Sequence, residues 1–169
     1  DTCYKIKKKD HRFRRFWFKN KKTRNNKMKK ILIVNANYYK NISLSLIKNA
    51  KKVLDQSKLN TSIINVPGVL EIPITVSKYI KRYDGFIALG CVIKGETPHF
   101  DLICKASFDA IMKISINFKK PIANGIITAL NMKQAKLRSL SNNNNHKPNK
   151  GFEAANAVIS VLNNVPKKT

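Results

Sequence analysis

Acidic residues are scarce in this chain of 169 residues, which holds nine Asp and Glu against 34 Lys and Arg. The formal net charge is therefore +25 at neutral pH. Such an excess of positive charge is typical of proteins that bind nucleic acid, and nucleic-acid binding is the first function that the composition favours.

Cysteines are few as well, and Cys3, Cys91 and Cys104 show no CxxC spacing. This pattern excludes both a disulfide framework and a cysteine-ligated zinc site. We expect a reducing compartment, the cytoplasm, and no bound metal. Long apolar runs are also missing: none approaches the roughly 18–20 residues that span a bilayer, which excludes an integral membrane protein.

The chain has enough apolar residues for a folded core, since 43% of it is hydrophobic. That share is ordinary for globular proteins and argues against wholesale disorder. The length fits one domain, or one domain with an appended arm.

The first 30 residues differ from the rest, because they hold 14 of the 34 basic residues and two of the nine acids. They show no sustained apolar periodicity and no uncharged stretch of the kind found in secretory signals. A basic–aromatic run over residues 11–18 could bind nucleic acid or an anionic membrane surface, and the whole arm could be a targeting peptide. Because Met28-Lys29-Lys30 directly precedes the first expected strand, we favour an upstream extension that is disordered or non-native.

Short apolar runs alternate with helical periodicity from Ile31 onward. The runs predict strands at residues 31–34, 62–66, 86–89 and 121–127. Apolar spacings of three and four predict helices over residues 42–54, 103–118, 132–140 and 154–162, and another helix begins near Pro73. Continuous apolar strands that alternate with helices indicate a parallel sheet covered by helices on both faces.

Ligands of such sheets bind beyond the carboxyl ends of the strands, which selects the loops at 35–40, 67–71, 91–99 and 128–131. Glu96 and Thr97 precede a helix start, where free N–H groups could hold an anion. His99 lies at the same helix start and could exchange protons near neutral pH. On the residues alone, Thr97 as a simple helix cap and His99 as an exposed surface residue stay open.

The other candidate residues also allow two interpretations each. Glu71 could complement a helix dipole or accept hydrogen bonds from a polyol. Tyr38 and Tyr39, which we expect at the end of the first strand, could offer a flat face to a heterocycle or serve as packing. Arg138 and Lys150 could bind phosphate or be ordinary surface charges.

Four ordered motifs in these loops resemble one family, the 6,7-dimethyl-8-ribityllumazine synthases, over residues 31–162. They are Val-Pro-Gly-Val-Leu-Glu-Ile-Pro at 66–73, Ala-Leu-Gly-Cys-Val-Ile-Lys-Gly-Glu-Thr-Pro-His-Phe-Asp at 88–101, Pro-Ile-Ala-Asn-Gly-Ile-Ile-Thr at 121–128 and Asn-Lys-Gly-Phe-Glu-Ala-Ala at 149–155.

The resemblance implies an α/β fold, a flavodoxin-like three-layer sandwich with a four-stranded parallel sheet, over residues 31–164 and followed by a short tail at 165–169. It implies a transferase of riboflavin biosynthesis that uses no cofactor. Its substrates would be 5-amino-6-(D-ribitylamino)uracil and 3,4-dihydroxy-2-butanone 4-phosphate, and phosphate and water would be released.

By their positions in the motifs, the resemblance implies that Tyr38 stacks on the pyrimidine and that His99 is the catalytic histidine. Arg138 matches a phosphate-binding arginine that arrives from a neighbouring subunit, and Lys150 matches a further substrate-binding residue. The phosphate-cradling pair matches Glu96 and Thr97. The segments that contact the uracil and ribityl chain match Val69, Leu70, Glu71, Cys91, Val92, Ile93 and Asn124.

Two departures from the family pattern stand out. Lys94 takes the place of a usual arginine, which keeps the charge and loses the planar fork. The loop at 139–148 is longer than the version associated with icosahedral shells and resembles that of pentameric members. We therefore expect a homopentamer, or a decamer of two such pentamers, with active sites at subunit interfaces. We expect neither a membrane nor a nucleic acid as partner. Two rival functions stay open: a nucleic-acid binder acting through residues 1–30, and a paralogue that binds a flavin or lumazine or is a related riboflavin-pathway synthase.

Overall fold

The structure, a computed structural model, describes residues 28–140 and 149–164. Most of the basic arm predicted at 1–30, most of the longer loop predicted at 139–148 and the tail at 165–169 fall outside these residues. No helix within the described ranges is long and apolar enough to cross a membrane.

Four parallel strands form one sheet in the order β2-β1-β3-β4. The strands are β1 (Lys30–Ala36), β2 (Asn60–Val66), β3 (Gly85–Ile93) and β4 (Ile122–Ala129). The helices are α2 (Lys40–Gln56), α3 (Glu71–Tyr79), α4 (His99–Phe118), α5 (Met132–Ser139) and α6 (Lys150–Asn163). The predicted flavodoxin-like arrangement of a parallel sheet with helices is confirmed.

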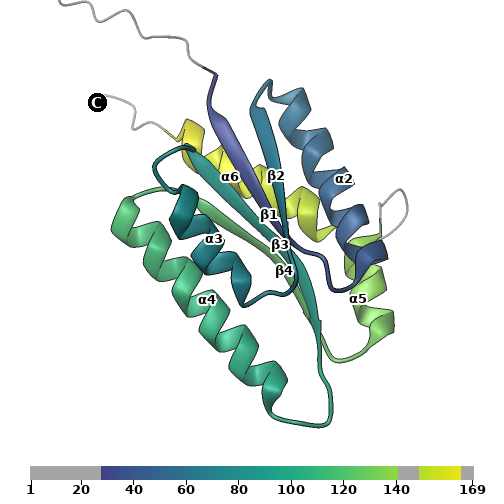
Figure 1. Ribbon diagram of the computed structural model, residues 1–169. Coiled ribbons are helices and arrows are strands. Elements are labelled where there is room, and N and C mark those ends of the chain that lie inside the picture. Colours follow the sequence, from purple (N-terminus) through teal and green to yellow (C-terminus); the bar gives the residue numbers. More distant parts are fainter. Residues whose placement is uncertain (1–27, 141–148, 165–169) are drawn as a thin grey trace, which may run out of the picture.

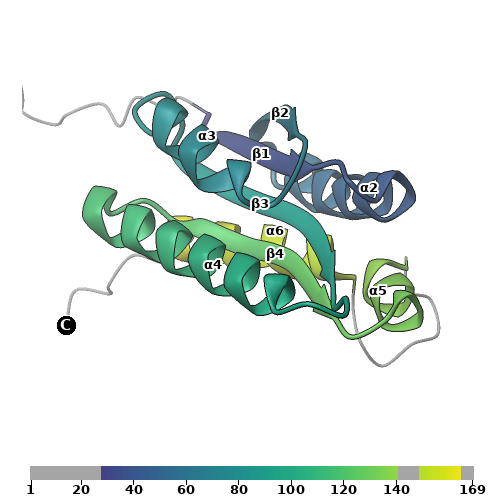
Figure 2. The same cartoon turned by 60° about the horizontal axis from the view of Figure 1, so that its bottom comes forward.

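Helices cover both faces of the sheet (Figures 1 and 2). Because side chains alternate along a strand, β1 contributes to two separate cores. Ile31 and Ile33 pack in the cluster shared with α2 and α6, whereas Leu32 and Val34 pack in the cluster shared with α3 and α4. Because β1 is buried on both faces of the sheet, its sequence is a continuous apolar run and does not alternate between apolar and polar residues.

All four predicted loops are shorter in the structure, because strands or helices take up their ends: they cover 37–39, 67–70, 94–98 and 130–131. β3 continues through Ile93 because β4 pairs with it as far as Ala129, so residues 91–93 are strand and the loop covers 94–98. The same pairing places Thr128 in β4. β1 ends at Ala36, so Tyr38 and Tyr39 belong to the turn that leads into α2 instead of ending the strand.

Helix α4 ends on a lysine in a left-handed conformation, since the φ angle of Lys119 is 51°. The amide of Lys119 donates to the carbonyl of Ile116, and that of Lys120 to the carbonyl of Ser115, a bonding pattern that normally carries glycine at this place. A side chain is strained there and glycine is not.

We therefore expect Lys119→Gly to raise the free energy of unfolding by about 1 kcal/mol. Urea denaturation measures the change. The matched control is Lys113→Gly, an exposed lysine within the same helix, which we expect to cost about 1 kcal/mol because glycine disfavours helix interiors. Two variants destabilised to the same extent would contradict the strain at Lys119.

Candidate active site

A pocket of about 240 Å³ opens beyond the carboxyl ends of the strands. It lies where the chain order reverses, because β1 leads to β2 on one side and has β3 on the other, which is where ligands bind in sheets of this type. Its lining comes from the turns after β1 and β2, from the end of β3 and from the start of α4: Tyr38, Tyr39, Gly68, Val69, Cys91, Val92, Ile93, His99 and Ile103.

The turn from β1 into α2 supplies the aromatic wall of the pocket. Tyr38 is 74% exposed, whereas Tyr39 is half-buried and packs against the core beneath α2. Their ring centroids are 5.0 Å apart with an interplanar angle of 74°, an edge-to-face contact. The structure therefore presents one ring to solvent and holds the other in place beside it.

The turn from β2 into α3 brings a close backbone approach to the pocket. A Cβ atom at Gly68 would lie 2.9 Å from Oε2 of Glu71, the far end of an exposed side chain that can rotate away. Val69 is buried and lines the pocket. Leu70 and Glu71 follow directly at the start of α3, both exposed, and lie beside the pocket without lining it.

The end of β3 and the start of α4 form the opposite wall. Cys91 is buried, Val92 and Ile93 are half-buried, and the loop after them is exposed. Glu96 and Thr97 lie in that loop, two or more residues before the helix, and are not among the lining residues. The N-cap of α4 is Pro98, with no side-chain hydrogen bond, so the interpretation of Thr97 as a helix cap is wrong. His99 is exposed and faces the pocket.

Three residues implied by the resemblance lie away from this pocket. Asn124 stands opposite Ala88 within β4, half-buried, and its Oδ1 accepts a hydrogen bond from the amide of Ile126 at 3.0 Å. Arg138 and Lys150 lie at the end of α5 and the start of α6. Within a single chain, none of these three residues lines the pocket that contains His99.

Arg138 and Lys150 instead meet at one carboxylate that sequence reasoning missed. Nη2 of Arg138 lies 3.0 Å from both carboxylate oxygens of Glu153, and Nζ of Lys150 lies 3.0 Å from Oε2. Burial on its own would raise the pKa of Glu153, but hydrogen bonds and positive charge from Lys150 and Arg138 outweigh it and lower the pKa. The one signal in the sequence was the spacing of three between Lys150 and Glu153, just before the helix expected over residues 154–162; the structure starts that helix at Lys150 and so brings the two side chains together.

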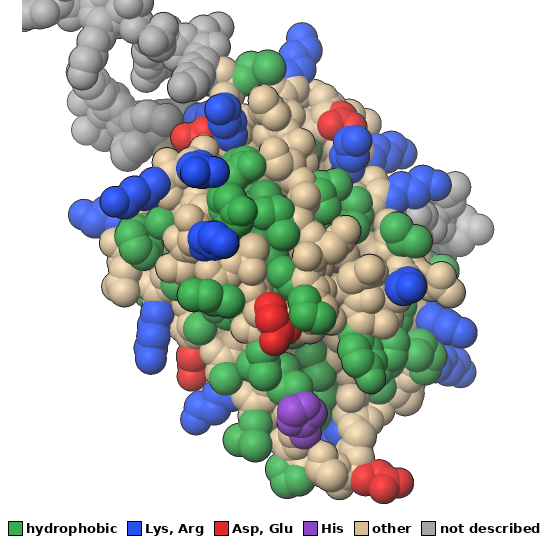
Figure 3. All heavy atoms as spheres, viewed as in Figure 1, with side chains coloured by type: hydrophobic (Ala, Val, Ile, Leu, Met, Phe, Trp, Pro, Cys, Tyr) green, Lys and Arg blue, Asp and Glu red, His purple; other side chains and the backbone are tan. Residues whose placement is uncertain are grey.

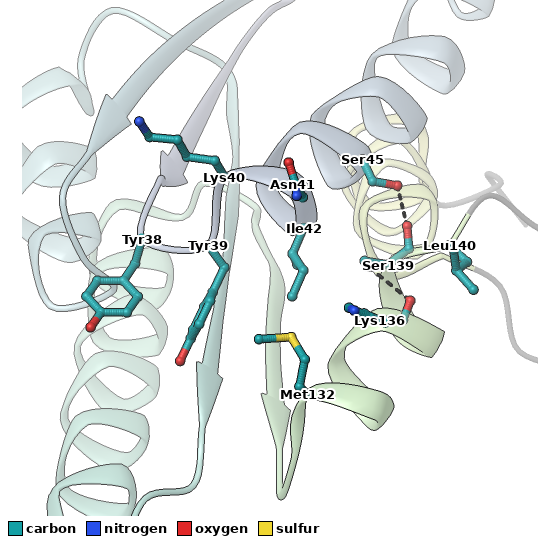
Figure 4. A pocket seen from close by; sticks show the side chains of 10 residues that line it. All are labelled: Tyr38, Tyr39, Lys40, Asn41, Ile42, Ser45, Met132, Lys136, Ser139 and Leu140. Atoms are coloured by element: carbon teal, nitrogen blue, oxygen red, sulfur yellow. Dashed lines mark hydrogen bonds between the residues drawn. The ribbon is translucent and has the colours of Figure 1, made fainter.

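A second cavity of about 770 Å³ lies between the start of α2 and α5. Tyr38 and Tyr39 line this cavity as well as the smaller pocket. Figure 4 shows Ile42 and Met132 pointing toward each other across it, and the hydroxyl of Ser45 donating to the carbonyl of Ser139. In the described part of the chain, no group of three or more His, Cys, Asp or Glu side chains is placed to hold a metal.

The thiol of Cys91 lies in the pocket wall, and burial raises its pKa to about 12. A cysteine in the unfolded chain ionises near pH 8.5, at about its reference value. The protonated thiol of Cys91 therefore makes its full contribution to stability below about pH 8.5. That contribution is lost as the pH rises toward the pKa of Cys91 in the folded protein, because in that interval only the thiol of the unfolded chain ionises.

We expect the free energy of unfolding to fall between pH 8 and 10, and to fall less in Cys91→Ala than in the wild type. The difference in slope corresponds to at most about one proton released on unfolding, because one thiol has been removed. Urea denaturation at both pH values measures this. Cys104→Ala serves for comparison, since burial also raises the pKa of Cys104. Equal pH slopes in the wild type and Cys91→Ala would contradict the expectation.

Comparisons with known proteins agree on one family. A sequence model described as 6,7-dimethyl-8-ribityllumazine synthase matches residues 28–165. A protein of that name from Bartonella bacilliformis is 40% identical over 136 residues, which cover 78% of this chain and 87% of the relative. Relatives of the same name from Zymomonas mobilis and Agrobacterium fabrum are 38% and 36% identical, over 80% and 78% of this chain and 96% and 91% of their own lengths.

The matched range contains all four motifs, the whole sheet and the residues that line the small pocket. The family predicted from those motifs is therefore confirmed, and this chain belongs to the 6,7-dimethyl-8-ribityllumazine synthase family.

Proposed function

We propose that this protein is a transferase of riboflavin biosynthesis, acting in the cytoplasm, that condenses 5-amino-6-(D-ribitylamino)uracil with 3,4-dihydroxy-2-butanone 4-phosphate. The products are 6,7-dimethyl-8-ribityllumazine, phosphate and water, and the reaction uses no cofactor. One observation carries the proposal: Tyr38, Val69, Cys91 and His99 are far apart in the sequence and line a single pocket.

The pyrimidine binds against the ring of Tyr38, whose exposed face suits stacking on a flat heterocycle. Strand ends and turns surround the same space, and their backbone groups can bind the uracil edge and the ribityl hydroxyls. In this arrangement Val69, Leu70 and Glu71 act from the β2–α3 turn, and residues 91–93 act from the end of β3.

His99 carries the proton transfers of the reaction. Imine formation and phosphate loss each need a group that gives and takes protons near neutral pH, and an imidazole does both. His99 lines the pocket from the first residue of α4, and Glu96 and Thr97 precede it in the loop where the phosphate binds. Holding the two substrates together supplies much of the remaining rate.

A neighbouring subunit completes the site. The phosphate needs a fixed cation, and Arg138, the residue expected from a neighbouring subunit, lies away from the pocket of its own chain. Lys150 and Asn124 also lie away from that pocket. Large apolar side chains on α4 support association, since Leu102, Met112 and Ile116 are 67%, 59% and 65% exposed. A second copy that covered such side chains would remove apolar surface from water.

We expect the protein to be a pentamer in solution, or a decamer of two paired pentamers. Light scattering after size-exclusion chromatography measures the mass. We expect Ile116→Asp to shift the mass toward smaller species, because a buried unpaired charge opposes association. A hollow shell of many pentamers, or a monomeric wild type that forms product, would contradict this assembly.

The function is tested by mixing the full chain with both substrates and following absorbance and fluorescence of the lumazine, with phosphate release measured in parallel. We expect one phosphate for each lumazine formed. Binding of a lumazine without its formation would instead identify a paralogue that binds the heterocycle. Basic side chains of the described residues are scattered over the face in Figure 3 rather than gathered in one patch. Binding of nucleic acid through residues 1–30 is tested by repeating a DNA- and RNA-binding assay after deleting them.

A further inference from the structure

The exposed ring of Tyr38 needs support if it is to stack on a substrate. The residue lies in the short turn between β1 and α2, and 74% of it is open to solvent. An aromatic side chain so exposed samples several rotamers, and fixing one of them on binding weakens affinity. A neighbour that holds the ring beforehand therefore improves binding of the pyrimidine.

Tyr39 is placed to give that support. Its ring meets the ring of Tyr38 edge to face, with 5.0 Å between centroids. It is itself anchored, because it packs against the core under α2 and its carbonyl accepts the amide of Ser43 at 2.9 Å. Burial raises the pKa of the Tyr39 phenol, with smaller contributions from Cys91 and Tyr38, so the side chain stays neutral in this setting.

Tyr39 also stands between two spaces. It lines the pocket of about 240 Å³ and the cavity of about 770 Å³ between α2 and α5. Figure 4 shows Tyr38 and Tyr39 side by side, both pointing away from the start of α2. Removing the ring of Tyr39 would therefore free Tyr38 and remove part of the wall shared by the two spaces.

We propose that Tyr39 is a positioning residue, whose ring holds Tyr38 in the orientation that stacks on the pyrimidine substrate. The proposal rests on the proposed function and deepens it, because it adds a determinant of pyrimidine binding that does not itself touch the reacting atoms. It predicts an effect on one substrate and not on the other.

The experiment compares Tyr39→Leu and Tyr39→Phe in the full chain. We expect Tyr39→Leu to raise KM for the aminouracil roughly 2- to 10-fold, the factor that an edge-to-face aromatic pair is worth. We expect KM for the butanone phosphate and kcat to change less than about twofold. Tyr39→Phe keeps the ring edge and restores the wild-type KM. Equal effects of Leu and Phe, or equal shifts in both KM values, would overturn the proposal.

The matched control is Tyr83→Leu. Tyr83 is also half-buried and in edge-to-face contact with an aromatic ring, Phe86 at 6.0 Å, but it packs in the other core beneath α3 and α4. A general loss of stability would affect both variants, whereas only Tyr39→Leu is expected to change the KM for the aminouracil. A KM shift of the same size in Tyr83→Leu would overturn the role of Tyr39.

A double-mutant cycle shows whether Tyr39 acts through Tyr38. In the Tyr38→Ala background, Tyr39→Leu should change aminouracil binding by less than about twofold, because the ring to be held is gone. An undiminished effect in that background would overturn the mechanism. Calorimetric titration with the aminouracil gives the same readout without turnover. If the wild type forms no lumazine, the proposed function fails while this titration still tests Tyr39.

Discussion

Replacing Gly151 with alanine is expected to lower the free energy of unfolding by about 3 kcal/mol, at the upper end of what overpacking usually costs. Gly151 is buried in the first turn of α6, where this helix crosses α2. A Cβ atom there would lie 2.2 Å from the carbonyl oxygen of Leu46 and 2.9 Å from its carbon. These atoms are helix backbone and cannot rotate away, so α2 and α6 would have to separate.

Urea denaturation of Gly151→Ala against the wild type measures this cost. Gly95→Ala is the matched control, because nothing lies within 4 Å of a Cβ atom at Gly95. We expect the control to stay within about 0.5 kcal/mol of the wild type, as surface substitutions usually do. A Gly151→Ala protein as stable as Gly95→Ala would show that the helices can move apart freely, contrary to their tight crossing.

Replacing His99 with alanine is expected to slow lumazine formation by a factor of about 10 to 100. A positioned general acid or base typically accelerates a reaction about 100-fold or more, so its loss should cost up to that factor. The fold should survive, because His99 is exposed at the start of α4 and no core side chain depends on it. Binding of the two substrates should persist, since the pocket walls remain. Steady-state kinetics with both substrates, together with urea denaturation, separates the two quantities.

Lys105→Ala is the control for His99→Ala. Lys105 is exposed on the same helix and lies outside the pocket lining, so its loss should leave kcat within about twofold of the wild type. Unchanged turnover in His99→Ala would contradict the catalytic role and leave proximity of the substrates as the source of the rate.

The alternation of short apolar runs with helical spacing was enough to predict the parallel sheet and its covering helices. It was enough because burial on both faces makes each inner strand uniformly apolar, a pattern that is visible in the order of residues. The length of β3 was not predictable in the same way. Val92 and Ile93 are strand only because β4 runs alongside them, and pairing between segments about 35 residues apart leaves no local signal.

The residues of the candidate site also fall into two groups: those predictable from the sequence and those that only the folded structure reveals. His99, Val69 and residues 91–93 were predicted from loop position and motif, and they do line one pocket, whereas Leu70, Glu71, Glu96 and Thr97 do not line it. The ion pairs of Arg138 and Lys150 with Glu153, and the half-buried position of Tyr39 between two spaces, were not found. Single-sequence reasoning treats each charged or aromatic residue separately, whereas these arrangements depend on which side chains meet.

The sequence by itself determined the sheet, the loops that bear chemistry and the family, because these follow from local periodicity and from ordered motifs. Its net charge of +25 alone favours nucleic acid as a partner, whereas the motifs in the loops indicate small-molecule substrates. Only the tertiary structure decided which of those loops share a pocket, which cations are held by Glu153, and why Gly151 must lack a side chain. Each of these is a contact between segments distant in the chain, fixed by packing and not by the residues on either side.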